Sequence, residues 1–137
     1  MKFLFFLIIV LTLTLTNTSC KKKDDNNNTH NKTVAEKIQG IWHLNNVTYN
    51  DHVDNVDNRD TLTGASGDIV DFRTDGKVYS SVQGTRDTVS YSVPTDSQII
   101  IDIYTFDIKI LTDNAFTIYA KDAIGADYSE ETDNFIR

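Results

Sequence analysis

The chain has 137 residues, 39% of them hydrophobic and 24% charged, with one Cys, one Pro and a net charge of −7. This length suits a single domain, and a lone cysteine excludes an internal disulfide. The acidic balance argues against nucleic-acid partners, which bind to basic surfaces. The sequence also holds no Cys/His cluster of the kind that binds zinc, so we expect no cofactor.

Residues 1–19 have the pattern of a secretory signal peptide. A positive start at Lys2 precedes an almost unbroken apolar run from Phe3 to Leu15. That run is shorter than the roughly 20 residues of a membrane-spanning helix. A polar stretch then leads to Cys20, the one cysteine of the chain.

A small residue before a single cysteine, just after an apolar segment, resembles the lipobox of bacterial lipoproteins. The position three before the cysteine is Asn17, where the usual motif has Leu, and the looser form of Bacteroidota-type bacteria resembles this chain more closely. The resemblance implies that Cys20 becomes the first residue and carries acyl chains such as palmitate, each buried CH₂ contributing about 0.8 kcal/mol to membrane binding. We therefore expect an outer-membrane lipoprotein that faces the periplasm or the cell surface. The alternative is an ordinary secreted protein cleaved near Ser19.

Residues 20–33 are predicted to form a flexible tether, since a Lys- and Asp-rich start and an Asn- and Thr-rich remainder cannot form a core. Residues 34–137 then form the domain, with 8 basic and 18 acidic residues and a net charge of −10. Such a surface repels anionic lipid and nucleic acid. The expected partner is therefore a membrane reached through the lipid anchor, and the sequence identifies no protein partner.

The domain is predicted to open with a short helix capped by Thr33 and Glu36 and ended by Gly40. After it, apolar residues alternate with polar ones and turn residues recur, as in antiparallel strands joined by hairpins. The turn at Asp75-Gly76 carries the strongest hairpin signal. Eight strands are expected, at residues 41–50, 68–73, 77–83, 87–93, 98–103, 106–111, 115–121 and 132–137.

Two features interrupt this alternation. The apolar residues change parity between Leu44 and Val47, which predicts a β-bulge near Asn45-Asn46. Residues 51–67 are expected to form a long polar loop. Because consecutive antiparallel strands with one apolar face close naturally on themselves, we predict an all-β fold. It is a small eight-stranded up-and-down antiparallel barrel with a short N-terminal helix.

The triplet Gly40-Ile41-Trp42 stands at the entry to the first strand, directly after the helix. This placement resembles the lipocalin-like domains of Bacteroidota lipoproteins, and the resemblance covers residues 34–137. It implies that Trp42 plugs the closed end of the barrel and that a basic side chain, here Arg137, covers it. The second lipocalin motif, Thr-Asp-Tyr, is absent. Trp42 as an ordinary core aromatic is the alternative.

A barrel of eight strands is either filled by its own side chains or holds one small ligand. Bulky interior residues, with Ile103 and Ile110 among them, favour a filled barrel. The leading hypothesis is a lipid-anchored, non-catalytic domain that binds a small hydrophobic ligand if the barrel is hollow. The alternative is a filled accessory or interaction module of the cell envelope with the 51–67 loop as its contact surface. The candidate cavity residues are Phe72, Ser80, Tyr91, Ile101, Ile108 and Phe116.

Catalytic and metal sites find little support in the sequence. His43 and His52 have no paired nucleophile, so we predict no enzyme activity and no catalytic residue. Asp54, Asp57 and Asp60 recur every three residues and are a weak candidate for Ca²⁺, although the spacing of an EF-hand is absent. A solvated acidic loop is the favoured interpretation.

Overall fold

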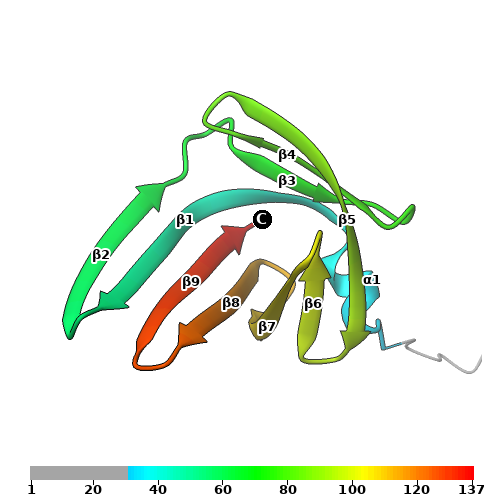
Figure 1. Cartoon of the computed structure of the whole chain (residues 1–137). Helices are drawn as coiled ribbons and strands as arrows, with labels where there is room; N and C mark the ends of the chain where they lie inside the picture. The colour runs from blue at the N-terminus through cyan, green and yellow to red at the C-terminus, as the bar shows by residue number, and fades with distance from the viewer. Residues whose placement is uncertain (1–30) are drawn as a thin grey trace, which may run out of the picture. The chain divides into compact units, whose positions relative to one another are not determined.

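The computed structural model describes residues 31–137; the expected signal peptide, Cys20 and most of the tether lie outside the described residues. Within them, the strands form one antiparallel sheet of order β2-β1-β3-β4-β5-β6-β7-β8-β9, which closes because β1 also pairs with β9 (Figure 1). The fold is a closed eight-stranded barrel with one extra strand, β2, and the predicted all-β barrel is confirmed. The elements are α1 (Val34–Ile38), β1 (Gly40–Val53), β2 (Val56–Thr63), β3 (Ile69–Phe72), β4 (Lys77–Val82), β5 (Thr85–Thr95), β6 (Gln98–Ile101), β7 (Tyr104–Leu111), β8 (Ala115–Ile124) and β9 (Asp127–Ile136).

The short helix α1 begins with the predicted capping box. The Thr33 hydroxyl accepts a hydrogen bond from the Glu36 amide at 3.3 Å, and the Glu36 carboxylate accepts one from the Thr33 amide at 2.7 Å. These two bonds satisfy amide groups that have no partner within the helix. Gly40 has a φ of +107° and starts β1 directly after the helix, so the chain reverses where the sequence predicts that it does.

β1 is long and serves three neighbours. Residues 40–43 pair with β3 and residues 46–53 pair with β2, while β9 pairs along residues 43–52. The register with β9 shifts between Leu44 and Asn46, which confirms the predicted bulge. This extra residue keeps Val47 on the same buried side as Leu44, because it shifts the alternation by one position.

The prediction of a polar loop at residues 51–67 is wrong. The segment consists of the end of β1, a two-residue turn at Asp54-Asn55, β2, and a short connection to β3. Both turn residues have positive φ angles, 53° and 63°, as a type I′ hairpin turn requires. Sequence reasoning missed β2 because every residue on it except Leu62 is exposed, so no alternation of apolar and polar residues marks the strand.

Aromatic side chains fill the centre of the barrel. Trp42, Phe72 and Phe116 are at most 1% exposed, and Phe116 lies with its ring centre 5.4 Å from that of Trp42 and 5.8 Å from that of Phe72. Phe135 of β9 stacks on Phe116 at 5.6 Å. Such pairs each contribute about 0.5–1.5 kcal/mol beyond the burial of their area. The core therefore joins residues from strands at both ends of the chain.

The alternation predicts that Ile103 and Ile110 point into the barrel, but in the structure both are exposed. Ile103 lies in the turn between β6 and β7 and is 77% exposed. Ile110 is 48% exposed because the pairing of β7 with β8 shifts between Ile108 and Ile110, which turns the second side chain outward. A register shift that the sequence does not announce therefore removes one expected core residue.

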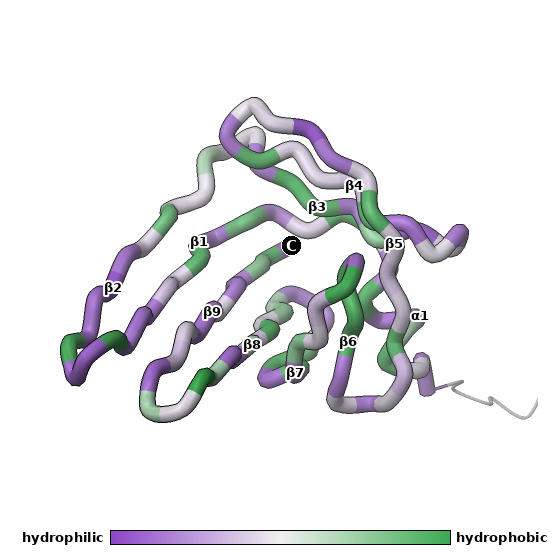
Figure 2. The backbone as a smooth tube through the Cα atoms, in the orientation of Figure 1, coloured by the Kyte–Doolittle hydropathy of each residue, from purple (hydrophilic) through white to green (hydrophobic). Residues whose placement is uncertain are grey.

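Four strands extend past the shorter strands on the other side of the barrel. We call this part the extension; it comprises residues 46–53 of β1, 56–63 of β2, 117–124 of β8 and 127–134 of β9. Its order is β2-β1-β9-β8, and Figure 1 shows its tips side by side. β7 pairs with β8 only as far as Tyr119, and β2 pairs with β1 alone. Figure 2 shows β2 as a mostly hydrophilic strand.

Candidate functional site

Gly40, Trp42 and Arg137 come together at the end of the barrel next to α1. The Trp42 Nε1 donates a hydrogen bond to the Ile38 carbonyl at 2.7 Å, and the Arg137 Cζ lies 3.7 Å from the centre of the Trp42 ring. The Arg137 Nη2 also donates to the carbonyl oxygens of Ile38 and Gln39, at 3.3 and 2.5 Å. A Cβ on Gly40 would lie 3.5 Å from that Nη2. The guanidinium thus covers the indole and binds the last carbonyls of the helix.

Three of the six candidate cavity residues fill the interior. Phe72 and Phe116 belong to the buried aromatic core. The Tyr91 ring packs edge-on against Phe72 at 5.1 Å, and its hydroxyl donates to the Arg73 carbonyl at 2.9 Å. Burial raises the pKa of the Tyr91 hydroxyl. These side chains occupy the space in which a ligand would bind near the Trp42 end.

The other three candidates are only partly buried. Ser80 is partly buried and stands between Val70 and Asp87 in the register of β3, β4 and β5. Ile101 and Ile108 are partly buried and pack against the core. These three side chains are therefore partly accessible to solvent, and Ser80 is the polar one among them.

The extension has an outer face held by a hydrogen-bond network around Glu130. The Glu130 carboxylate accepts hydrogen bonds from Asn50 at 3.1 Å, Tyr119 at 2.9 Å and Lys121 at 3.0 Å. These donors, Asn50 first, lower the pKa of Glu130 to about 2. Four bonded residues from three strands fix this face of the extension.

The histidines do not form a site together. His52 lies on the outer face, where its Nδ1 is 2.7 Å from an oxygen of Asp57 and its ring stacks on Tyr128 at 4.8 Å. His43 is exposed near the other end of β1. The rise of a strand separates the two histidines by about 30 Å. The two histidines are therefore too far apart to contact one group together.

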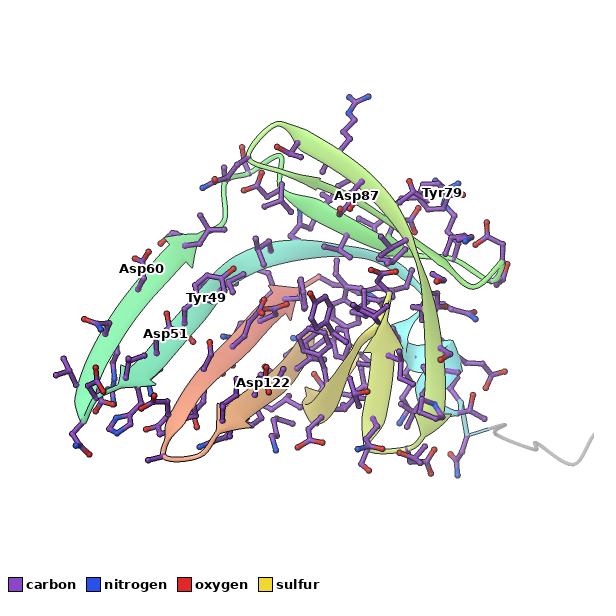
Figure 3. The ribbon with its side chains drawn as sticks, in the orientation of Figure 1. Tyr49, Asp51, Asp60, Tyr79, Asp87 and Asp122 are labelled. Atoms are coloured by element: carbon purple, nitrogen blue, oxygen red, sulfur yellow. The ribbon has the colours of Figure 1, made fainter. Side chains whose placement is uncertain are left out.

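The inner face of the extension carries carboxylates without basic side chains. Tyr49 and Asp51 on β1 lie beside Asp60 on β2, as Figure 3 shows. Arg59 and Lys121 are the two Lys or Arg residues of the extension. Along β2 and β8 they occupy positions that point to the opposite side, so they lie on the outer face. An open hollow of about 350 Å³ near the tips has both acidic and aliphatic walls, formed in part by Asp51, Val53, Asp122, Ile124 and Asp127.

Asp133 is the most perturbed of these acids. In the register it stands between Val47 of β1 and Ile118 of β8, both buried. Its Oδ1 is sealed from solvent and has no hydrogen-bond partner. Burial and the neighbouring negative charge of Glu131 raise the pKa of Asp133 to about 8. Sequence reasoning gave no role to this residue, because its neighbours in the sequence, Thr132 and Asn134, are polar and its apolar neighbours follow only from the strand register.

The weak calcium candidate is not assembled. Asp57 and Asp60 lie on opposite faces of β2, since they are three positions apart in the strand, and Asp57 contacts His52. Asp54 lies in the turn, where its amide donates to Asp127 at 3.1 Å. Over residues 31–137, no three acidic, His or Cys side chains are close enough to hold a metal ion.

The described residues thus define a small closed antiparallel barrel with one strand outside it. No protein-family model matches the chain, and no curated protein matches it. Within residues 31–137, no helix has the length and apolar character needed to cross a membrane.

Proposed function

We propose that the protein is a non-catalytic lipoprotein of the outer membrane, anchored through Cys20, whose lipocalin-like barrel is an interaction module. The observation that carries the proposal is the contrast between the filled barrel and β2. Phe72, Phe116 and Tyr91 occupy the interior, whereas β2 lies outside the barrel, and one of its edges pairs with no other strand of residues 31–137. The contact surface is the hairpin of β1 and β2, where sequence analysis expected a contact loop.

The anchor is tested by metabolic labelling with an alkyne analogue of palmitate. The wild-type chain should take up the label and remain in the membrane fraction, because two or three acyl chains bind a bilayer stably. Cys20→Ala should lose both label and membrane association, and Asn26→Ala is the matched control in the expected tether. A wild-type chain that takes up no label contradicts the anchor.

The contact surface is tested by a photo-crosslinking amino acid placed at Thr61 of β2 in cells. Both Thr61 and the control position Asp96 are exposed, and Asp96 lies in the turn between β5 and β6, away from the extension. Crosslinked species should form at position 61 and not at position 96. Equal crosslinking at both positions, or none at position 61, contradicts a contact surface on β2.

A small apolar ligand is the second candidate function, favoured by the partial exposure of two apolar candidate cavity residues. Ile101 and Ile108 are only partly buried. Native mass spectrometry of the lipidated protein, purified from cells, should then show an extra mass that is lost on denaturation. Ile108→Phe should remove that mass, whereas Ile110→Phe on the outer surface should keep it. A mass that is unchanged in Ile108→Phe, or absent from the wild type, contradicts this function.

A further inference from the structure

The outer edge of β2 presents backbone groups that no other strand of residues 31–137 covers. Val53 and Val56 flank the two-residue turn and form the closing hydrogen-bonded pair of the hairpin. Alternate residues after Val56 therefore bond to β1, and the N–H and C=O groups of Asp57, Arg59 and Thr61 point away from it. The Thr61 amide agrees with this, since it binds the Asp60 carboxylate at 2.7 Å.

An unpaired strand edge is a template for another strand, and charged side chains decide which strand it accepts. Arg59 and Asp57 lie on the outer face of β2 and Asp60 on the inner face. When two antiparallel strands pair, directly opposed residues point to the same face. Each register of β2 with a second β2 therefore opposes a defined set of charges.

Only one central register of two β2 strands brings opposite charges together. With Asn58 facing Asn58 of a second copy, Asp57 of each copy faces Arg59 of the other. In the next register, Arg59 faces Arg59 of the second copy. In the one after that, Asp60 faces Asp60. Like charges directly opposed destabilise a sheet, whereas opposite charges stabilise it.

We propose that β2 pairs antiparallel with β2 of a second copy, with Asn58 opposite Asn58, and so joins two extensions into one continuous sheet. In this register Asp57 and Arg59, whose backbone groups point outward, form the two hydrogen-bonded pairs. The inference rests on the proposal that the hairpin of β1 and β2 is the contact surface, and it names the partner as this same chain. The paired strands are short, so the dimer is weak and forms where the protein is concentrated.

A disulfide trap tests the register in residues 31–137, which hold all the described helices and strands and the core that they form, and lack the single cysteine. Asn58 faces Asn58 at a non-hydrogen-bonded site, where the Cα atoms lie about 4.5 Å apart. That spacing permits a disulfide. Asn58→Cys should give a covalent dimer under oxidation, at least about tenfold faster than Asp60→Cys. Equal or faster crosslinking of Asp60→Cys overturns the register.

A charge swap tests the pairing by sedimentation equilibrium. Asp57→Arg and Arg59→Asp should each weaken self-association at least about tenfold, and the double variant should restore it to within about threefold. The matched controls Asp96→Arg and Arg86→Asp change the charge equally at exposed positions outside β2 and should have no effect. A wild type that stays monomeric up to about 1 mM, a double variant as weak as the single ones, or controls that weaken equally overturn the proposal.

The outcomes also separate this inference from the proposed function. Crosslinking of position 61 to a different protein, without self-association, leaves the contact surface standing and overturns the β2 pairing. A chain that takes up no acyl label overturns the anchor, while the pairing of residues 31–137 is measured without any anchor.

Discussion

At Asp133 the chain keeps an acid between two buried aliphatic residues. Its folded pKa is about 8, above the value of about 3.9 for an unfolded aspartate. The native state therefore binds more protons than the unfolded state between these values, and stability falls as pH rises from about 4 to about 8. Glu131 on the same strand and Tyr49 on β1 are titratable groups near it, and Asp51, Asp60, Asp122 and Asp127 lie farther along the same face.

Replacing this acid should therefore stabilise the protein at alkaline pH. Asp133→Asn removes the charge and is expected to raise the free energy of unfolding at pH 8.5 by about 1–3 kcal/mol, the usual cost of a buried unsatisfied polar group. The gain should shrink toward pH 5, where Asp133 is protonated. Urea denaturation at several pH values measures it, with Asp113→Asn in the exposed β7–β8 turn as control. If the free energy of unfolding of Asp133→Asn depends on pH as that of the wild type does, the raised pKa of Asp133 is contradicted.

Arg137 supports the indole of Trp42 and the end of α1 together. Arg137→Ala should destabilise the fold by about 1–2 kcal/mol, since a cation–π contact and hydrogen bonds to carbonyls are lost. Trp42 is the single tryptophan, so its emission should also shift to longer wavelength. Arg137→Lys keeps the charge without the planar guanidinium, and its stability should lie between that of the wild type and that of Arg137→Ala. An Arg137→Ala protein with unchanged emission and midpoint would refute this support.

Among the elements, the connection between β2 and β3 depends on one glycine, Gly64. The Gly64 amide donates to the Asn45 carbonyl at 2.9 Å, and a Cβ on Gly64 would lie 1.9 Å from the Leu44 carbonyl oxygen. Gly64→Ala must displace β1 or the connection and should cost about 1–3 kcal/mol. Thermal or urea unfolding checks the loss, and Gly67→Ala, whose Cβ would meet no atom within 4 Å, should be nearly neutral. Equal effects at both glycines would contradict the close approach.

The elements also show what the sequence can predict. The Asp75-Gly76 hairpin, the capping box at Thr33 and the bulge after Leu44 each follow from short-range chemistry, and the structure contains all three. β2 has no such mark, because it packs on one strand and faces solvent on both sides. Ile110 fails for a different reason: a bulge changes the direction of every side chain after it, and no residue type in β7 announces one.

The candidate site was harder to predict than the fold. Side chains such as Phe72 and Phe116 are apolar whether they line a cavity or fill it, and only their packing distances decide between the two. The unpaired edge of β2 is likewise a property of the whole sheet order and not of residues 56–63 alone.

On the scale of the whole molecule, closure joins distant parts of the chain. Residues 43–52 of β1 pair with residues 128–136 of β9, and Trp42 contacts Phe116 and Arg137. Such non-local contacts predict slow folding, in the range of milliseconds to seconds. In stopped-flow refolding, the Trp42 fluorescence change and the far-ultraviolet circular dichroism signal should develop in one phase. Burial of Trp42 within the dead time, ahead of the β signal, would contradict closure as the limiting step.

The pairing of β1 with β9 also has a consequence for biosynthesis. A ribosome makes β1 long before it makes β9, so the growing chain lacks one wall of its barrel for most of its synthesis. Over that interval Trp42 and Leu44 have no Phe135 to cover them, and the barrel of the nascent domain cannot close. A chain in that condition remains unfolded, which is the form that a narrow protein-conducting channel can accept.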